Sequence, residues 1–198
     1  MTTFFTSDLH LGHQNVIQYC NRPFDSVEHM NESLIANWNA VVGQYDTVFV
    51  LGDFAMGKIA ETLPLALRLN GYKYLVPGNH DRCWEDKTGK NWAEKYEQAG
   101  FNVLPNTVNF ILNDKTSSIA HAVTLCHFQL LSDRVDERFT EFHQLESDRW
   151  LIHGHVHSLW RVKGRQINVG VDVWDYAPVS EQELVEFIKH QTRRLSHE

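Results

Sequence analysis

The 198-residue sequence predicts one layered α/β domain that covers residues 1–198. Three observations support this class. Short apolar runs alternate with segments of helical periodicity, the length suffices for one hydrophobic core, and no repeat or linker divides the chain. A hydrophobic content of 42% can supply that core, and 22% charged residues is typical of a globular protein.

Six short segments have the β-branched and aromatic composition of strands. Several of them end directly before acidic, histidine or glycine residues, so the strand ends are where chemistry is expected. The predicted strands are residues 3–6, 47–51, 72–76, 122–126, 150–153 and 166–169.

Four segments between these runs have the pattern of helices. The first covers residues 25–42, where Asp25 is the predicted N-cap and Glu28 follows three positions later, as in a capping box. Residues 59–69 and 91–99 form the next two helices, and a fourth begins at Ser180.

Two polar segments are less regular than the rest of the chain. Residues 82–90 follow one cluster of polar side chains directly, and residues 132–149 lie between two others. Both positions suit a lid over a site at the strand ends. An ordinary surface loop or a solvated helix fits the same composition, and the sequence leaves the choice open.

Composition narrows the class of protein. A net charge of -7 without a basic patch argues against a binder of long nucleic acid. Three cysteines without a CxxC pair suggest reduced thiols, as in a cytoplasmic protein. The N-terminus does not have the pattern of a signal peptide, and no apolar run reaches the roughly 18 residues of a membrane span. We therefore expect a cytoplasmic protein without a membrane partner.

Acidic and histidine side chains follow the first two predicted strands. Asp8 and His10 are two positions apart, which places both side chains on one face of an extended segment. Asp53 follows Gly52 at the end of the next strand, where its two carboxylate oxygens could bridge two cations. Each motif alone is equally consistent with a turn that an aspartate caps.

The third strand ends in a denser cluster of polar residues, Asn79, His80 and Asp81, on a Pro-Gly turn. The amide oxygen can bind a metal, the histidine can protonate a leaving group, and the aspartate can hold the imidazole in one tautomer. A surface turn is the alternative, because Asn, Asp and Gly are common turn formers.

Two later strands also end in histidines. His127 follows one strand, and His155 and His157 lie two positions apart after the other, behind Gly154. Donor groups at five strand ends are difficult to assign to packing, since buried polar side chains need partners. Nitrogen and oxygen donors without thiolates suit Mn²⁺, Fe²⁺ or Zn²⁺.

The order Asp-x-His, Gly-Asp, Gly-Asn-His-Asp, His and Gly-His-x-His resembles the calcineurin-like metallophosphoesterase superfamily, and in particular its small bacterial or phage-type members. The resemblance covers residues 6 to about 170. It implies a four-layer α/β/β/α sandwich of mixed sheets and a site for two divalent cations at the carboxyl ends of the strands. We favour Mn²⁺, with Fe²⁺, Zn²⁺ or Ni²⁺ as other candidates.

The resemblance also implies a role for each motif residue. Asp53 would bridge the two cations, and a hydroxide shared by the cations would attack phosphorus. His80 would contact the scissile phosphate and assist the leaving oxygen, with Asp81 orienting its ring. One cation would be held by Asp8, His10, Asp53 and His157, and the other by Asp53, Asn79, His127 and His155.

The predicted function is hydrolysis of a small phosphodiester or nucleotide. A non-catalytic binding scaffold of the same fold is the main alternative, and hydrolysis of a non-phosphate ester or amide is a weaker one. His13 either contacts substrate or caps the next helix, and Arg22 either clamps a phosphate or forms a structural ion pair. Asn168 and Asp172 are predicted to support the metal ligands from behind.

Overall fold

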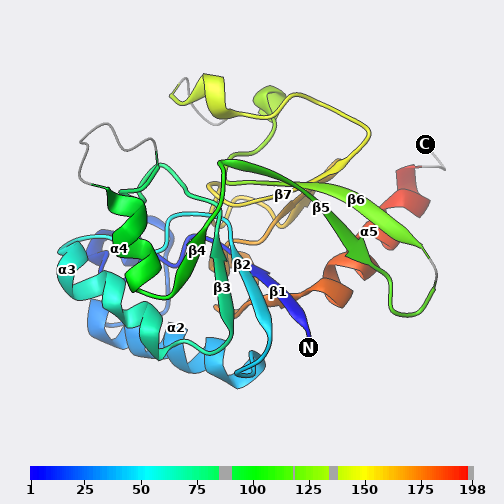
Figure 1. Ribbon diagram of the computed structural model, residues 1–198. Coiled ribbons are helices and arrows are strands. Elements are labelled where there is room, and N and C mark those ends of the chain that lie inside the picture. Colours follow the sequence, from blue (N-terminus) through cyan, green and yellow to red (C-terminus); the bar gives the residue numbers. More distant parts are fainter. Residues whose placement is uncertain (85–90, 118, 134–137, 196–198) are drawn as a thin grey trace.

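The computed structural model describes residues 1–84, 91–117, 119–133 and 138–195, and two five-stranded sheets form its centre (Figure 1). The first sheet has the strand order β10-β1-β2-β3-β4, in which β1 to β4 are parallel and β10 is antiparallel. Its strands are β1 (Thr3–Thr6), β2 (Thr47–Val50), β3 (Tyr72–Leu75), β4 (Phe101–Val103) and β10 (Val179–Ser180).

The second sheet has the order β5-β6-β7-β9-β8. Its three central strands are parallel, and the edge strands β5 and β8 are antiparallel to their neighbours. The bounds are β5 (Thr107–Asn113), β6 (Ala120–Cys126), β7 (Trp150–His153), β8 (Val162–Lys163) and β9 (Gln166–Asn168).

Helices surround the two sheets. In Figure 1, α2, α3 and α4 lie beside the first sheet, and α5 lies next to β5. None of the helices in the described ranges combines the length and apolar character needed to cross a membrane. The helices are α1 (Gln14–Tyr19), α2 (Val27–Val41), α3 (Ile59–Thr62), α4 (Trp92–Gln98) and α5 (Glu181–Leu195), with 3₁₀ turns at Leu63–Arg68, Leu131–Asp133, Thr140–Phe142 and Val171–Val173.

The alternation of side chains along the strands creates two cores. In β1, Phe4 packs into the cluster beneath α2, whereas Phe5 packs into the cluster between the sheets. Val48 and Phe49 of β2 divide in the same way, because successive strand residues face opposite sides of a sheet. Leu184, Val185 and Ile188 of α5 join the cluster between the sheets. Both faces of the first sheet are therefore buried, which fixes its strand ends rigidly.

The predicted mixed α/β class with two sheets and packed helices is confirmed. All six predicted strands are present, with end shifts of at most two residues. The strands β4, β5, β8 and β10 and the helix α1 were not predicted. Residues 63–68 form a 3₁₀ turn rather than the second half of a helix, and Pro64 lies at its start.

The predicted capping of α2 needs a correction. Ser26, not Asp25, is the N-cap residue, and its hydroxyl accepts a hydrogen bond of 3.1 Å from the backbone N–H of His29. A serine and an aspartate are similarly good caps, so the sequence alone offers two neighbouring choices.

The two polar segments predicted as lids or loops are described only in part, since residues 85–90 and 134–137 lie outside the described residues. In the described part of the second segment, Phe139 and Phe142 pack against a small cluster that includes Phe128 and Leu151. This end of the segment is therefore attached to the second sheet.

Candidate metal centre

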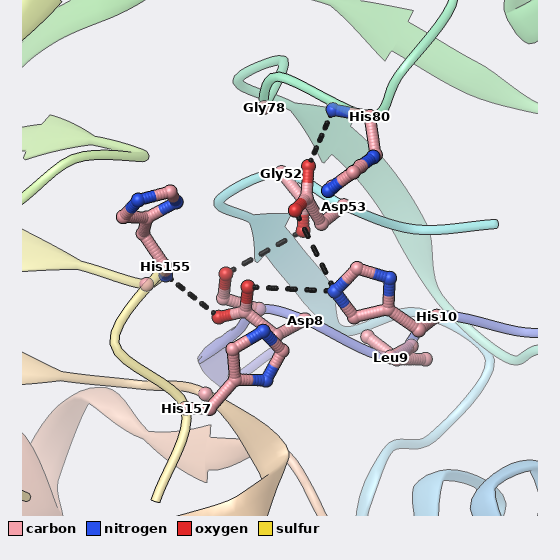
Figure 2. Close-up of polar contacts among 12 residues, drawn as sticks. Asp8, Leu9, His10, Gly52, Asp53, Gly78, His80, His155 and His157 are labelled. Carbon is pink, nitrogen blue, oxygen red and sulfur yellow. Dashed lines mark hydrogen bonds and ion pairs between the residues drawn. The ribbon is translucent and has the colours of Figure 1, made fainter. Parts of the chain in front are cut away.

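The predicted ligands converge at one edge of the sandwich, where parallel strands end together (Figure 2). The two sheets contribute jointly, because β1, β2 and β3 belong to the first and β6 and β7 to the second. The segments that carry the ligands are Asp8 and His10 after β1, Asp53 after β2, Asn79 after β3, His127 after β6, and His155 and His157 after β7.

The backbone at these positions is unusual. Half of the described non-glycine residues with positive φ are predicted ligands. Left-handed backbone costs a non-glycine residue energy and persists where the surroundings enforce it, most often at functional sites. The residues are Asp8 (φ 57°), His10 (φ 52°), Asp53 (φ 55°), His155 (φ 70°) and His157 (φ 47°).

One group of donors surrounds His10. Its Nε2 lies 3.5 Å from Asp53 Oδ2 and 4.0 Å from Asp8 Oδ1, and all three residues are at most 2% exposed. The rings of His10 and His157 stack with centroids 5.1 Å apart. One ligand atom each from Asp8, His10 and His157 lies within 4.8 Å of the others, so these three can hold one cation.

A second group of donors surrounds His127. Its Nε2 lies 3.5 Å from Asp53 Oδ2, 3.1 Å from Asn79 Oδ1 and 3.3 Å from His155 Nδ1. Asp53 Oδ2 is therefore at the same distance from His10 Nε2 as from His127 Nε2. A carboxylate between two sets of donors in this way is placed to bridge two cations.

The donors fit a divalent cation. Among the described residues, Asp8 Oδ1 and both ring nitrogens of His10 are buried polar atoms without a hydrogen-bond partner. Buried polar groups are normally paired, and an unpaired one indicates a missing partner such as an ion. Carboxylate oxygens and imidazole nitrogens in one cluster suit Mn²⁺, Fe²⁺, Zn²⁺ or Ni²⁺.

The buried carboxylates of the centre also favour positive charge beside them. Burial alone would lower the pKa of His127, but the facing Asp53 carboxylate raises it to about 9. Burial likewise opposes the charge on His157, yet Asp8 and the hydrogen bond that the His157 ring donates to Asp172 raise its pKa to about 11. Protons on these imidazoles balance the buried carboxylates here, and cations would take over that role on binding.

Asp81 connects two of the ligand loops. Its carboxylate accepts hydrogen bonds from the backbone N–H groups of Asp53 (2.8 Å), Phe54 (3.1 Å) and Gly78 (2.9 Å) and from the Tyr96 hydroxyl (3.3 Å). Burial, together with nearby Asp53, raises its pKa to about 6. The three backbone contacts hold the loops after β2 and β3 together, and the fourth joins them to α4. The prediction was instead that Asp81 orients the imidazole of His80.

His80 lies at the rim of the centre. Its side chain is exposed, its backbone N–H donates to Asp53 Oδ1 at 2.9 Å, and its ring centroid is 5.5 Å from that of His10 (Figure 2). An imidazole at this position can reach a molecule bound over the metals without being a ligand itself.

Two glycines permit the close approach of the loops. A Cβ on Gly52, which has φ of 90°, would lie 2.5 Å from His127 Nδ1. A Cβ on Gly154 would contact the Ser7 hydroxyl and lie 2.5 Å from Asp8 Oδ2. Any side chain at either position would push a predicted ligand out of place.

Arg22 has internal partners for its whole guanidinium. Nε and Nη2 bind the two oxygens of Asp172 at 2.7 and 2.9 Å, and Nη2 and Nη1 donate to the carbonyls of Asp8 (2.7 Å) and Leu9 (2.9 Å). The residue is 4% exposed. This geometry favours the structural ion pair over the predicted phosphate clamp, and it fixes the backbone of the first motif.

Asn168 and Asp172 contact the loop that carries His157. Asn168 Nδ2 donates to the carbonyl of His157 at 2.7 Å, and Asp172 Oδ2 lies 3.1 Å from His157 Nδ1. The Asp172 carboxylate thus joins His157, in the loop after β7, to Arg22, which follows α1 and binds the carbonyls of the first motif.

His13 occupies the N-cap position of α1 without a side-chain capping bond. Its ring centroid is 5.3 Å from that of His10, and the residue lines the cavity beside the centre. The position in the cavity supports contact with substrate, and the N-cap position supports a role at the start of α1.

Two residues near the centre were not predicted. The Phe128 ring packs on His155 with centroids 4.8 Å apart. Cys20 Sγ and one ligand atom each of His157 and Asp172 lie within 4.8 Å of one another. The position of Phe128 directly after a predicted ligand was a usable signal. Cys20 has no motif context, because only the tertiary fold brings α1 beside the histidine loop.

Comparisons with known proteins agree with this architecture. Residues 1–176 match the family model for calcineurin-like phosphoesterase. The chain is 33% identical over 195 residues to an uncharacterized protein of Methanocaldococcus jannaschii, covering 94% of this chain and 90% of that protein. It is 31% identical over 203 residues to the gene 66 protein of Mycobacterium phage L5, covering 95% and 94%.

A solved structure is similar over nearly its whole length. It is a protein of unknown function from Aquifex aeolicus with 25% sequence identity and a TM-score of 0.65, and the match covers 94% of this chain and 98% of that one. The family model spans every motif from Asp8 to Asp172. The chain therefore belongs to the calcineurin-like phosphoesterase family.

Proposed function

We propose that this chain hydrolyses a small phosphodiester or nucleotide at a centre of two divalent cations, with Mn²⁺ as the favoured metal. Family membership implies metal-dependent hydrolysis of phosphoesters. The observation that carries the two-cation proposal is the position of Asp53 Oδ2, which lies 3.5 Å from a histidine nitrogen on each side.

Each side chain has a proposed task in this reaction. Asp8, His10, Asp53 and His157 would hold one cation, and Asp53, Asn79, His127 and His155 would hold the other. When bound, the cations supply Lewis-acid charge and lower the pKa of bound water toward about 7.

His80 would donate a proton to the leaving oxygen from its exposed position at the rim. Its backbone N–H, bonded to Asp53 Oδ1, holds the residue next to the bridging carboxylate. Asp81 would act as a positioning residue, since its carboxylate ties the loops that present Asp53 and His80.

Charge supports a diester over a monoester. A diester has one negative charge, whereas a monoester dianion brings a second that needs its own partner. The described residues that line the cavity beside the centre include histidines but no permanently charged lysine or arginine to supply one. The net charge of -7 also supports a small substrate over a long nucleic acid.

The test is a panel of metals and substrates on metal-stripped protein. It compares bis(p-nitrophenyl) phosphate with p-nitrophenyl phosphate under Mn²⁺, Fe²⁺, Zn²⁺, Ni²⁺ and Mg²⁺, with Asp53→Ala as the control. We expect diester turnover to exceed monoester turnover and to disappear in the control. Metal binding without turnover of any ester would contradict the proposal and favour a binding scaffold.

A further inference from the structure

A cavity of about 510 Å³ opens beside the candidate metal centre. One wall consists of predicted site residues, so a molecule bound at the metals extends directly into it. Apolar side chains from three separate segments also line this cavity. They are Val16 and Tyr19 of α1, Met56 of the loop after β2, and Val156 and Leu159 of the loop after β7.

Two of these apolar residues are unusually exposed. Tyr19 is 75% exposed and Leu159 is 62% exposed, and both line the same cavity. Single exposed apolar side chains are ordinary on protein surfaces. Several of them around one cavity that adjoins a site indicate a surface that becomes buried when a ligand binds.

Apart from five histidines, the described lining of the cavity offers no partner for a second charge. Its described lining residues include no Lys, Arg, Asp or Glu. An anionic or cationic group that lies against the apolar side chains would lose water without gaining a counter-ion, which is unfavourable. The part of a substrate that contacts these side chains is therefore expected to be uncharged.

The shape of the wall also favours a planar group. The rings of His13 and Tyr19 meet edge to face, with centroids 6.3 Å apart and planes inclined at 77°. Aromatic rings pack well against such a surface in offset or edge-to-face arrangements. The flexible thioether of Met56, which lines the same cavity, can adapt to the edge of a ring.

From these observations we infer that the substrate has an uncharged aromatic substituent on its phosphate, which binds between Tyr19, Met56 and Leu159. This inference rests on the proposed function, because it assumes that the phosphate lies at the metal centre. It makes Tyr19 and Leu159 specificity residues for that substituent.

The experiment measures binding of non-hydrolysable phosphonates to manganese-loaded protein by calorimetry. Each probe has one substituent, so the result does not depend on which ester oxygen would leave. We expect phenylphosphonate to bind with a Kd about tenfold or more below that of methylphosphonate, because burial of a ring is favourable.

Surface variants assign the preference to the cavity. Tyr19→Ser and Leu159→Ala should reduce the ratio of the two Kd values to about threefold or less, since each removes part of the apolar wall. Tyr45→Ser and Leu67→Ala are matched controls, because these residues are 69% and 65% exposed away from the cavity. The controls should keep the full ratio.

The outcomes separate the two proposals. Equal binding of the phenyl and methyl compounds, or a ratio unchanged in both cavity variants, would overturn the inference while the metal centre stands. If neither inorganic phosphate nor any phosphonate binds the metal-loaded protein, the proposed function fails as well.

Discussion

The two ends of β2 carry the same residue type in opposite circumstances. Asp46 precedes the strand, and its two oxygens accept hydrogen bonds from the backbone N–H groups of Thr2 (2.7 Å) and Gly43 (2.9 Å). Asp53 follows the strand with left-handed backbone, and its Oδ2 faces His10 and His127 at 3.5 Å. Asp46 closes a turn, whereas Asp53 is placed for a ligand.

The two aspartates contribute to different properties of the protein, Asp46 to its stability and Asp53 to the candidate metal centre. A carboxylate that accepts backbone N–H groups stabilises the native state, as Asp46 does. Buried carboxylates and imidazoles in strained loops do the reverse until a cation binds. Substitutions at the two ends should therefore affect different properties, stability at one end and metal binding or turnover at the other.

The largest effect at the site end that leaves the metals in place should come from His80→Ala. We expect kcat for a diester to fall about 100- to 1000-fold, because a general acid is lost. Bound metal should not change, since alanine retains the N–H group that bonds Asp53. His29→Ala, on the exposed surface of α2, is the control that should keep full activity. Loss of metal from the His80 variant would instead make this residue a ligand.

The loop contact at Gly154 gives a second test. Gly154→Ala should destabilise the protein by about 1–3 kcal/mol, because the new methyl group would press on Ser7 and Asp8. Its affinity for Mn²⁺ should fall at the same time. Gly164→Ala is the matched control, with open space around the position and φ of 56°. It should cost about 1 kcal/mol through backbone strain alone and leave metal affinity unchanged. Denaturant unfolding and calorimetry distinguish the two, and equal metal affinities would argue against the predicted displacement of Asp8.

Metal removal should reverse the pH dependence of stability. In metal-free protein the pKa of His127 is about 9, above the ordinary 6.5, so its stabilising contribution is complete below pH 6.5 and is lost as the pH rises through 9. The slope is at most about 1.4 kcal/mol per pH unit for each proton. Manganese-loaded protein should instead gain stability over the same range, because ligation requires deprotonated imidazoles. Thermal unfolding between pH 7 and 9 is the measurement, and a metal-free protein that becomes more stable toward pH 9 would contradict the account.

The smallest effect should come from the other end of β2. Asp46→Ala removes two hydrogen bonds to backbone N–H groups and should lower the free energy of unfolding by about 1–2 kcal/mol. Metal content and diester turnover of the folded variant should be those of the unaltered protein. A change in turnover would break the contrast between the two strand ends.

The sequence predicted the strand ends well because each ligand directly follows an apolar run. The parallel strands of the first sheet then bring Asp8, Asp53 and Asn79 to one edge, whereas His127 reaches it only because the second sheet packs on the first. The roles of Arg22 and Asp81 were harder to predict. Both depend on contacts across the fold, from Arg22 to Asp172 and from Asp81 to the loop after β2.

Short length and an edge position in the sheet explain several of the elements that the sequence did not predict. The strands β8 and β10 have two residues each, too few to show an alternating pattern. β5 alternates only between half-buried and exposed positions over most of its length, because it is an edge strand. The sequence did not predict the apolar cavity either, because Tyr19, Met56 and Leu159 come from three distant segments.

In the proposed centre, Asp53 lies between two cations. Elemental analysis of protein reconstituted with Mn²⁺ and freed of excess metal tests it most directly, with Asp46→Ala as a variant that retains the centre. We predict two manganese ions per chain in both proteins and a loss of metal in Asp53→Ala. A stoichiometry of one, or two ions retained in Asp53→Ala, would contradict the bridging role.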